Sequence, residues 1–151
     1  MSKIKTFRGA MIDESIDTIL LHTNDGSKGY RIVDFQAIGS DPGNKTYEVV
    51  LKIFTTPQTA TPTGDIDFND QELIAVLYYL NNPATDNLSE MQILYDNMVF
   101  NQDLYITCQD SHNTPSTADV RTNYQLKLEQ VSLDLNENTV ATLKDIRNIA
   151  Q

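Results

Sequence analysis

The stretch YDNMVFNQDLYITCQD, residues 95–110, has apolar side chains on even positions and mostly polar side chains between them. The apolar positions are Met98, Phe100, Leu104, Ile106 and Cys108. Because successive side chains of a strand point to opposite faces, this two-residue period predicts a sheet with one buried face. The longer segment MQILYDNMVFNQDLYITCQD (91–110) predicts either two strands or one interrupted strand, with the break near the polar residues 101–103.

Other segments have the residue types and spacing of strands. They are IDTILLHT (16–23), YRIVDFQAI (30–38), TYEVVLKIFTT (46–56), QELIAVLYYLNNP (71–83) and the region from Tyr124 to Leu135. The leucines of 71–83 also fit helical spacing, but the adjoining tyrosines and β-branched residues favour a buried strand. In 30–38, the period puts Tyr30 and Ile32 on one face and Phe35 on the other, so we expect both faces to be partly covered.

Turn signals separate these segments. In SDPGNK (40–45), Pro42 fixes φ and Gly43 suits the positive φ of a type II turn. PQTATPTGD (57–65) predicts an exposed loop, and ATDNLSE (84–90) predicts a polar link. Between residues 129 and 131 the apolar positions change from even to odd, which predicts a β-bulge or a strand that crosses between sheets.

Together the segments predict a mainly β protein. We expect an antiparallel β-sandwich or jelly roll of about 7–9 strands with a short C-terminal helix. The helix is expected at 137–150, where an Asn-rich start precedes apolar residues at helical spacing. The 151 residues suit a single domain, with residues 1–12 as a candidate N-terminal arm.

Composition argues against several classes of partner. Lys and Arg total 11 against 21 Asp and Glu, a formal net charge of −10, so we expect no direct nucleic acid partner. No apolar run approaches the roughly 18 residues of a membrane span, so we expect a soluble protein without a membrane partner. In MSKIKTFRGAM no apolar stretch follows the basic residues, so we expect no secretory signal.

The sequence offers little catalytic chemistry. Cys108 is the only cysteine and suits a buried apolar position. Its neighbours Asp110, Ser111 and His112 lack a recognisable nucleophile motif, so we expect no enzyme and no catalytic residues. DIDFND (65–70) resembles the start of a calcium loop, but its sixth position is Asp and its twelfth is Val, which excludes an EF-hand. We expect no cofactor and no resident metal, with weak surface binding of calcium left open.

Three segments are candidates for contacts with other proteins. They contribute the basic residues Lys3, Lys5 and Arg8, the loop residues Pro57, Thr59, Thr61 and Pro62, and the C-terminal stripe of Val140, Leu143, Ile146 and Ile149. The basic residues could lie on an acidic surface of another chain or belong to an ordinary first strand. The stripe could dock on a neighbouring subunit or pack on the chain's own core.

Five segments, in the same order along most of the chain, resemble small structural proteins of uncultured marine bacteriophages. They are GYRIVDFQ (29–36), PGNK (42–45), KIFTTPQT (52–59), YDNMVFNQDLYIT (95–107) and YQLKLEQVSLDLNENTVATLKDIR (124–147). The resemblance implies a component of the virion, assembled in the host cytoplasm, and it implies no catalytic residues.

Within that setting we expect a capsid-associated shell, cement or decoration subunit that contacts copies of itself and other virion proteins. A tail, adaptor or fibre-base component is the first alternative. A glycan-binding module for host adhesion is the second alternative, because tyrosines and acids in loops bind sugars in other proteins. The chain contains no Trp, which weakens the glycan hypothesis.

Overall fold

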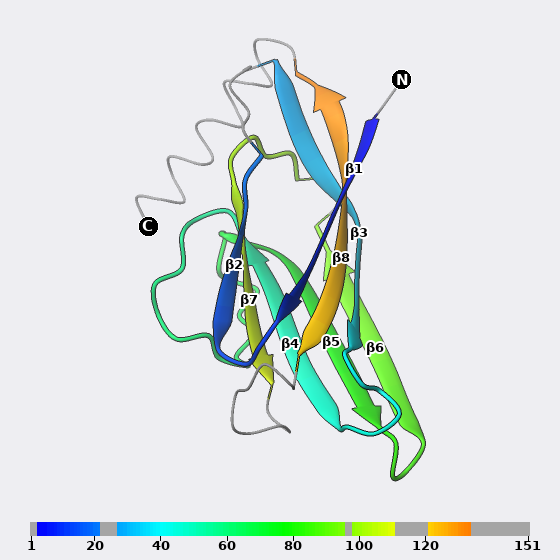
Figure 1. The fold of residues 1–151 in the computed structure, drawn as a ribbon. Helices are drawn as coiled ribbons and strands as arrows, with labels where there is room; N and C mark the ends of the chain where they lie inside the picture. Colours follow the sequence, from blue (N-terminus) through cyan, green and yellow to red (C-terminus); the bar gives the residue numbers. More distant parts are fainter. Residues whose placement is uncertain (1–2, 22–26, 96–97, 111–120, 134–151) are drawn as a thin grey trace.

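The computed structural model describes residues 3–21, 27–95, 98–110 and 121–133. These residues form eight strands and no helix (Figure 1). The strands are β1 (Lys3–Met11), β2 (Ser15–Ile19), β3 (Lys28–Gly39), β4 (Tyr47–Phe54), β5 (Leu73–Asn82), β6 (Asn87–Leu94), β7 (Leu104–Asp110) and β8 (Thr122–Ser132). The predicted C-terminal helix, residues 137–150, lies outside the described residues and stays a prediction.

The strands form two antiparallel sheets that face each other. One sheet has the order β1-β8-β3 and the other the order β2-β7-β4-β5-β6. Every strand pair within the two sheets is antiparallel. The predicted antiparallel β-sandwich is therefore confirmed. Within the described part of the chain, no helix has the length and hydropathy needed to cross a bilayer.

The strand order is nested like that of a jelly roll. The first strand pairs with the last, the second pairs with the seventh, and β4 pairs with β5. In a jelly roll with two four-stranded sheets, β3 would pair with β6. Here β6 instead extends the larger sheet beside β5. One edge of β3 and one edge of β6 therefore have no neighbouring strand among the described residues.

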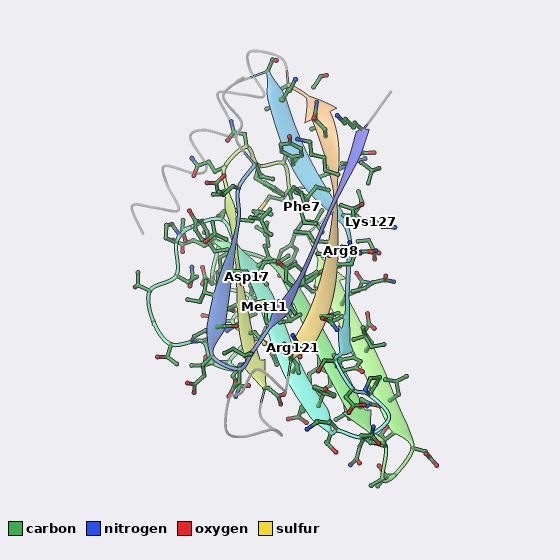
Figure 2. All side chains as sticks on the ribbon, viewed as in Figure 1. Phe7, Arg8, Met11, Asp17, Arg121 and Lys127 are labelled. Atoms are coloured by element: carbon green, nitrogen blue, oxygen red, sulfur yellow. The ribbon has the colours of Figure 1, made fainter. Side chains whose placement is uncertain are left out.

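The core lies between the sheets and is built by the two-residue period. The even positions Leu104, Ile106 and Cys108 of β7 are buried, as the alternation predicts. From the other sheet, Phe7 and Met11 of β1 pack into the same core (Figure 2). Sheet formation thus satisfies the backbone hydrogen bonds while one face of each sheet is removed from water.

Strands β4 and β5 are buried on both faces. Their inner residues belong to the core between the sheets, and a smaller apolar cluster lies on the outer face of the larger sheet. That cluster consists of Val50, Phe54, Leu73 and Val76, with Tyr78 packed against it. A strand buried on both faces reads as a continuous apolar run. This explains the ambiguous spacing of 71–83, where the predicted strand is confirmed over Leu73–Asn82.

The predicted irregularity at 129–131 is wrong in its position. The pairing of β8 has no register shift at 129–131. The register of the β3–β8 pair shifts instead between Ile32 and Asp34, so the bulge lies on β3. The extra residue reverses the facing of β3, so Tyr30 and Ile32 before it and Phe35 after it are all buried. The expectation that both faces of β3 would be partly covered is therefore wrong. The bulge turns the apolar residues before it and those after it toward the same core.

Two connections in the structure also differ from those that the sequence predicts. Residues 40–45 form a turn, but Gly43 does not have a positive φ, and the N–H groups of Asn44 and Lys45 both bond to the carbonyl oxygen of Asp41. The turn is therefore not type II. The segment 84–90, predicted as a polar link, contains the first half of β6. Its polar residues are compatible with a strand because β6 is exposed on both faces.

Candidate interaction surfaces

The three basic residues near the N-terminus do not form one patch. They lie on β1, which pairs with β8 along its whole length. Lys5 is half-buried, and its Nζ donates a hydrogen bond of 3.0 Å to the hydroxyl of Tyr30 and lies 5.3 Å from the ring centroid. Arg8 points to the outer face instead. Strand geometry thus separates Lys5 and Arg8, whereas Lys3 is exposed at the beginning of the strand.

The loop from Pro57 to Gly64 lies beside the outer face of the larger sheet. Pro57, Thr59 and Thr61 are exposed and Pro62 is half-buried. With Lys52 and Asp65, the loop lines a hollow of about 300 Å³. The remaining predicted contact residues, Val140, Leu143, Ile146 and Ile149, lie outside the described residues.

Lys52 is a buried amine beneath this loop. Its Nζ donates a 2.7 Å hydrogen bond to the carbonyl oxygen of Asp65 and lies 5.8 Å from the ring centroid of Phe54. Burial lowers the pKa of Lys52, while the nearby carboxylates of Asp65 and Asp70 raise it by less. These contacts tie the loop to the sheet, so Lys52 has a clear structural role.

The residues considered for chemistry have structural roles where they are described. Cys108 is buried, and burial raises the pKa of its thiol to about 12. Asp67 Oδ1 accepts a 2.9 Å hydrogen bond from the N–H of Asn69, as in an ordinary Asx turn. No group of three or more His, Cys, Asp or Glu residues in the described ranges is placed to hold a metal ion. Ser111 and His112 lie outside those ranges.

Strand β6 is an exposed edge that the sequence did not reveal. It runs along the right-hand side of the molecule in Figure 1 and pairs with β5 on one side only. Leu88 and Met91 are 67% and 63% exposed, and Ile93 is 36% exposed. Glu90 is its only charged residue. A short run of mixed residues gave no signal of this exposure, because the apolar side chains occur on both faces.

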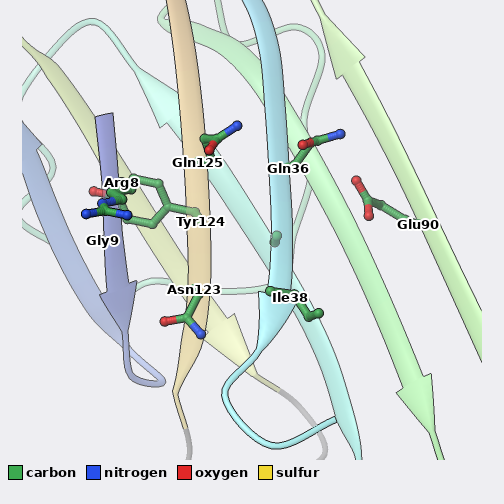
Figure 3. A pocket seen from close by; sticks show the side chains of 9 residues that line it. Arg8, Gly9, Gln36, Ile38, Glu90, Asn123, Tyr124 and Gln125 are labelled. Carbon is green, nitrogen blue, oxygen red and sulfur yellow. The ribbon is translucent and has the colours of Figure 1, made fainter. Parts of the chain in front are cut away.

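A second surface is a hollow of about 770 Å³ on the outer face of the β1-β8-β3 sheet (Figure 3). The pairing register places Arg8, Gln125 and Gln36 in one row across the three strands. Asn123 lies one row further along, opposite Ile38. Glu90 comes from β6 of the other sheet, and in Figure 3 its side chain and that of Gln36 point toward each other.

Among the described residues, the polar side chains of this hollow have no pairing partner. Arg8, Gln36, Glu90, Asn123 and Gln125 make no hydrogen bond or ion pair with one another or with any other described side chain. Partial burial raises the pKa of Glu90, with a smaller contribution from the charge of Asp34. One guanidinium and one carboxylate leave the hollow formally neutral within a chain of net charge −10.

No model of a known protein family matches the chain. No curated protein sequence is significantly similar to it.

Proposed function

We propose that the protein is a non-enzymatic structural subunit of a bacteriophage virion, associated with the capsid, that joins a second copy of itself through β6. The single observation that carries the assembly part is the unprotected edge of β6. The resemblance to small phage structural proteins supports the setting. Jelly rolls are used in viral capsid proteins, and the pairing of β1 with β8, β2 with β7 and β4 with β5 is shared with them, which supports the setting further.

Within the part of the chain that the structure describes, the edge of β6 lacks the usual protection of a monomer. An edge strand presents free N–H and C=O groups, and soluble proteins guard such edges with Lys, Pro, bulges or a covering segment. From Asn87 to Leu94 there is no Pro and no basic residue, and the pairing with β5 has no register shift. This edge is therefore chemically ready to accept another strand.

A second copy is the occupant that fits this edge best. Two antiparallel edges pair with themselves across a two-fold axis, so one surface serves both partners. The two bodies repel each other because each carries a net charge of −10, but Glu90 is the only charge that each β6 brings to the contact. Charge depletion is typical of the centre of an interface.

The expected dimer is weak. Covering the exposed parts of Leu88, Met91 and Ile93 contributes roughly 3 kcal/mol per copy. This gain and the new backbone hydrogen bonds are opposed by an association cost of about 4–15 kcal/mol. Assembly should therefore depend on concentration, and it should strengthen with salt because salt screens the repulsion between acidic bodies.

Sedimentation velocity across a concentration series tests the contact. We expect a monomer–dimer equilibrium in the wild type that Met91→Lys shifts to monomer. Leu20→Lys is the matched control, since it introduces the same charge at an apolar side chain that is 53% exposed and lies away from β6. A wild type that stays monomeric at high concentration and high salt would overturn the β6 contact.

The virion setting has a separate test. Mass spectrometry of purified phage particles is expected to detect the chain in stoichiometric amounts, and labelling of intact particles should place it on the capsid. Absence from the particles would overturn the virion proposal, and labelling at the tail would transfer the role to a tail, adaptor or fibre-base component.

A further inference from the structure

The hollow on the outer face of the β1-β8-β3 sheet differs from an ordinary solvated sheet surface. Elsewhere on the same face, Arg31 and Glu129 form an ion pair, with a 2.6 Å hydrogen bond from Arg31 Nε. At the hollow, Arg8 has no such partner among the described residues, although Glu90 lines the same space. The site thus keeps a cation and an anion apart on its two sides.

The unpaired groups offer donors and acceptors together. The amides of Gln36, Asn123 and Gln125 each present an NH₂ donor beside a carbonyl acceptor. The guanidinium of Arg8 only donates, and the ionised carboxylate of Glu90 only accepts. A ligand with many hydroxyl groups matches this mixture, because every hydroxyl donates one hydrogen bond and accepts others.

The shape and the charge of the hollow narrow the ligand class. Its volume of about 770 Å³ is in the range of small-molecule sites, and its open form suits an extended ligand. The lining groups sum to zero charge, so the site favours neither anions nor cations. Ile38, 54% exposed at the rim, offers an apolar contact for the C–H groups of a sugar ring.

We propose that this hollow binds a neutral oligosaccharide, with Arg8, Gln125 and Gln36 contacting its hydroxyl groups in one row and Glu90 closing the side at β6. This is a function beyond assembly through the β6 edge, because the two surfaces share only Glu90, and the row of Arg8, Gln125 and Gln36 belongs to the other sheet. Tyr124 is the only aromatic residue of the lining, and it is buried, so no exposed ring stacks on the sugar. The affinity is therefore expected near the millimolar range.

NMR titration of the ¹⁵N-labelled chain tests the site, with cellotriose, maltotriose and N-acetylchitotriose as separate probes up to roughly 20 mM, a range matched to millimolar affinity. At least one probe is expected to shift the side-chain NH₂ signals of Gln36, Asn123 and Gln125. Gln125→Ala removes the centre of the row, so it should weaken binding more than about tenfold. Gln102→Ala is the matched control, because Gln102 lies outside the hollow and should leave binding unchanged.

Three results would overturn the proposal. They are no shift with any probe, binding that survives Gln125→Ala in a variant with wild-type thermal unfolding, and binding of a charged heparin tetrasaccharide in preference to the neutral probes. Met91→Lys separates this proposal from the assembly proposal. Met91 is outside the lining of the hollow, so the monomeric variant should still bind sugar.

Discussion

Replacing Gly39 with alanine tests how tightly the end of β3 packs on the core. A Cβ at Gly39 would lie 2.3 Å from Cε2 of Tyr47 and 2.6 Å from its Cδ2 and Cζ. Carbon atoms in contact prefer about 3.5–4.0 Å, so the ring would have to move by about 1 Å. Tyr47 has no exposed surface, and its hydroxyl is hydrogen-bonded to Ser40 Oγ at 3.1 Å and to the N–H of Asp41 at 3.0 Å.

The expected loss of stability follows from these contacts. Overpacking of a core costs about 1–3 kcal/mol. Weakening the two hydrogen bonds of Tyr47 adds about 1–2 kcal/mol, and the lower entropy of the unfolded alanine chain returns about 0.5 kcal/mol. We therefore expect Gly39→Ala to lower the free energy of unfolding by about 2–4 kcal/mol, a large fraction of the 5–15 kcal/mol typical of a domain.

Urea denaturation followed by circular dichroism measures this change, with the slope of the transition as a check on two-state behaviour. Gly43→Ala is the matched control, since no atom lies within 4 Å of a Cβ there and φ is not positive. It should be neutral or slightly stabilising. Equal stability of the two variants would refute the reasoning. Tyr47→Leu shortens the clashing side chain, so it should reduce the cost of Gly39→Ala to less than about 1 kcal/mol.

Four further outcomes follow from three side chains. Cys108 is 1% exposed, and burial raises the pKa of its thiol to about 12. The thiol should therefore stay unreactive toward an aromatic disulfide reagent until the chain unfolds. Rapid labelling of the folded protein would contradict its burial. Tyr124→Phe removes the 3.1 Å hydrogen bond to Asp17 Oδ2 and should cost about 1–3 kcal/mol in urea denaturation. Burial, then the charge of Asp17, raises the pKa of Tyr124, so the folded state keeps the phenol proton to higher pH than the unfolded chain. The free energy of unfolding should therefore fall as pH rises above the ordinary value of 10.0, and less steeply in Tyr124→Phe; equal slopes would refute this. Arg31→Ala breaks the ion pair with Glu129, but the Arg31 side chain is 44% exposed and the pair is screened by solvent. The change in thermal midpoint should therefore correspond to a loss of no more than about 1 kcal/mol in the free energy of unfolding. A larger loss would show that the pair is not screened.

The spacing of apolar residues along the chain is enough to predict the class of fold. The period of two at Leu104, Ile106 and Cys108 fixes which side chains of β7 are buried, because alternate side chains of any strand share a face. The same reasoning identified β4 and β5. This prediction requires no information about neighbouring strands, because the alternation of side chains is a property of a single strand.

The way in which those strands combine depends on contacts between distant parts of the chain. The bulge at residue 33 turns Tyr30 and Phe35 to one face, and a period-based prediction that assumes a regular strand puts them on opposite faces. Strand β6 was predicted only in part: a strand was expected from Met91 onward, whereas residues 87–90 were expected in a polar link, and Leu88 and Met91 lie on opposite faces of an exposed edge. Its place beside β5, and the free edge that carries the assembly proposal, depend on long-range pairing.

The hollow on the outer face of the β1-β8-β3 sheet likewise could not be predicted from local spacing. Arg8, Gln36, Glu90 and Gln125 come from four strands and two sheets. The register aligns Arg8, Gln125 and Gln36, and the packing of the two sheets brings Glu90 beside them. No local pattern marks such a set, since each residue alone is an ordinary polar position on an exposed strand face. Local spacing determines which way a side chain points, whereas strand order and register determine what it meets.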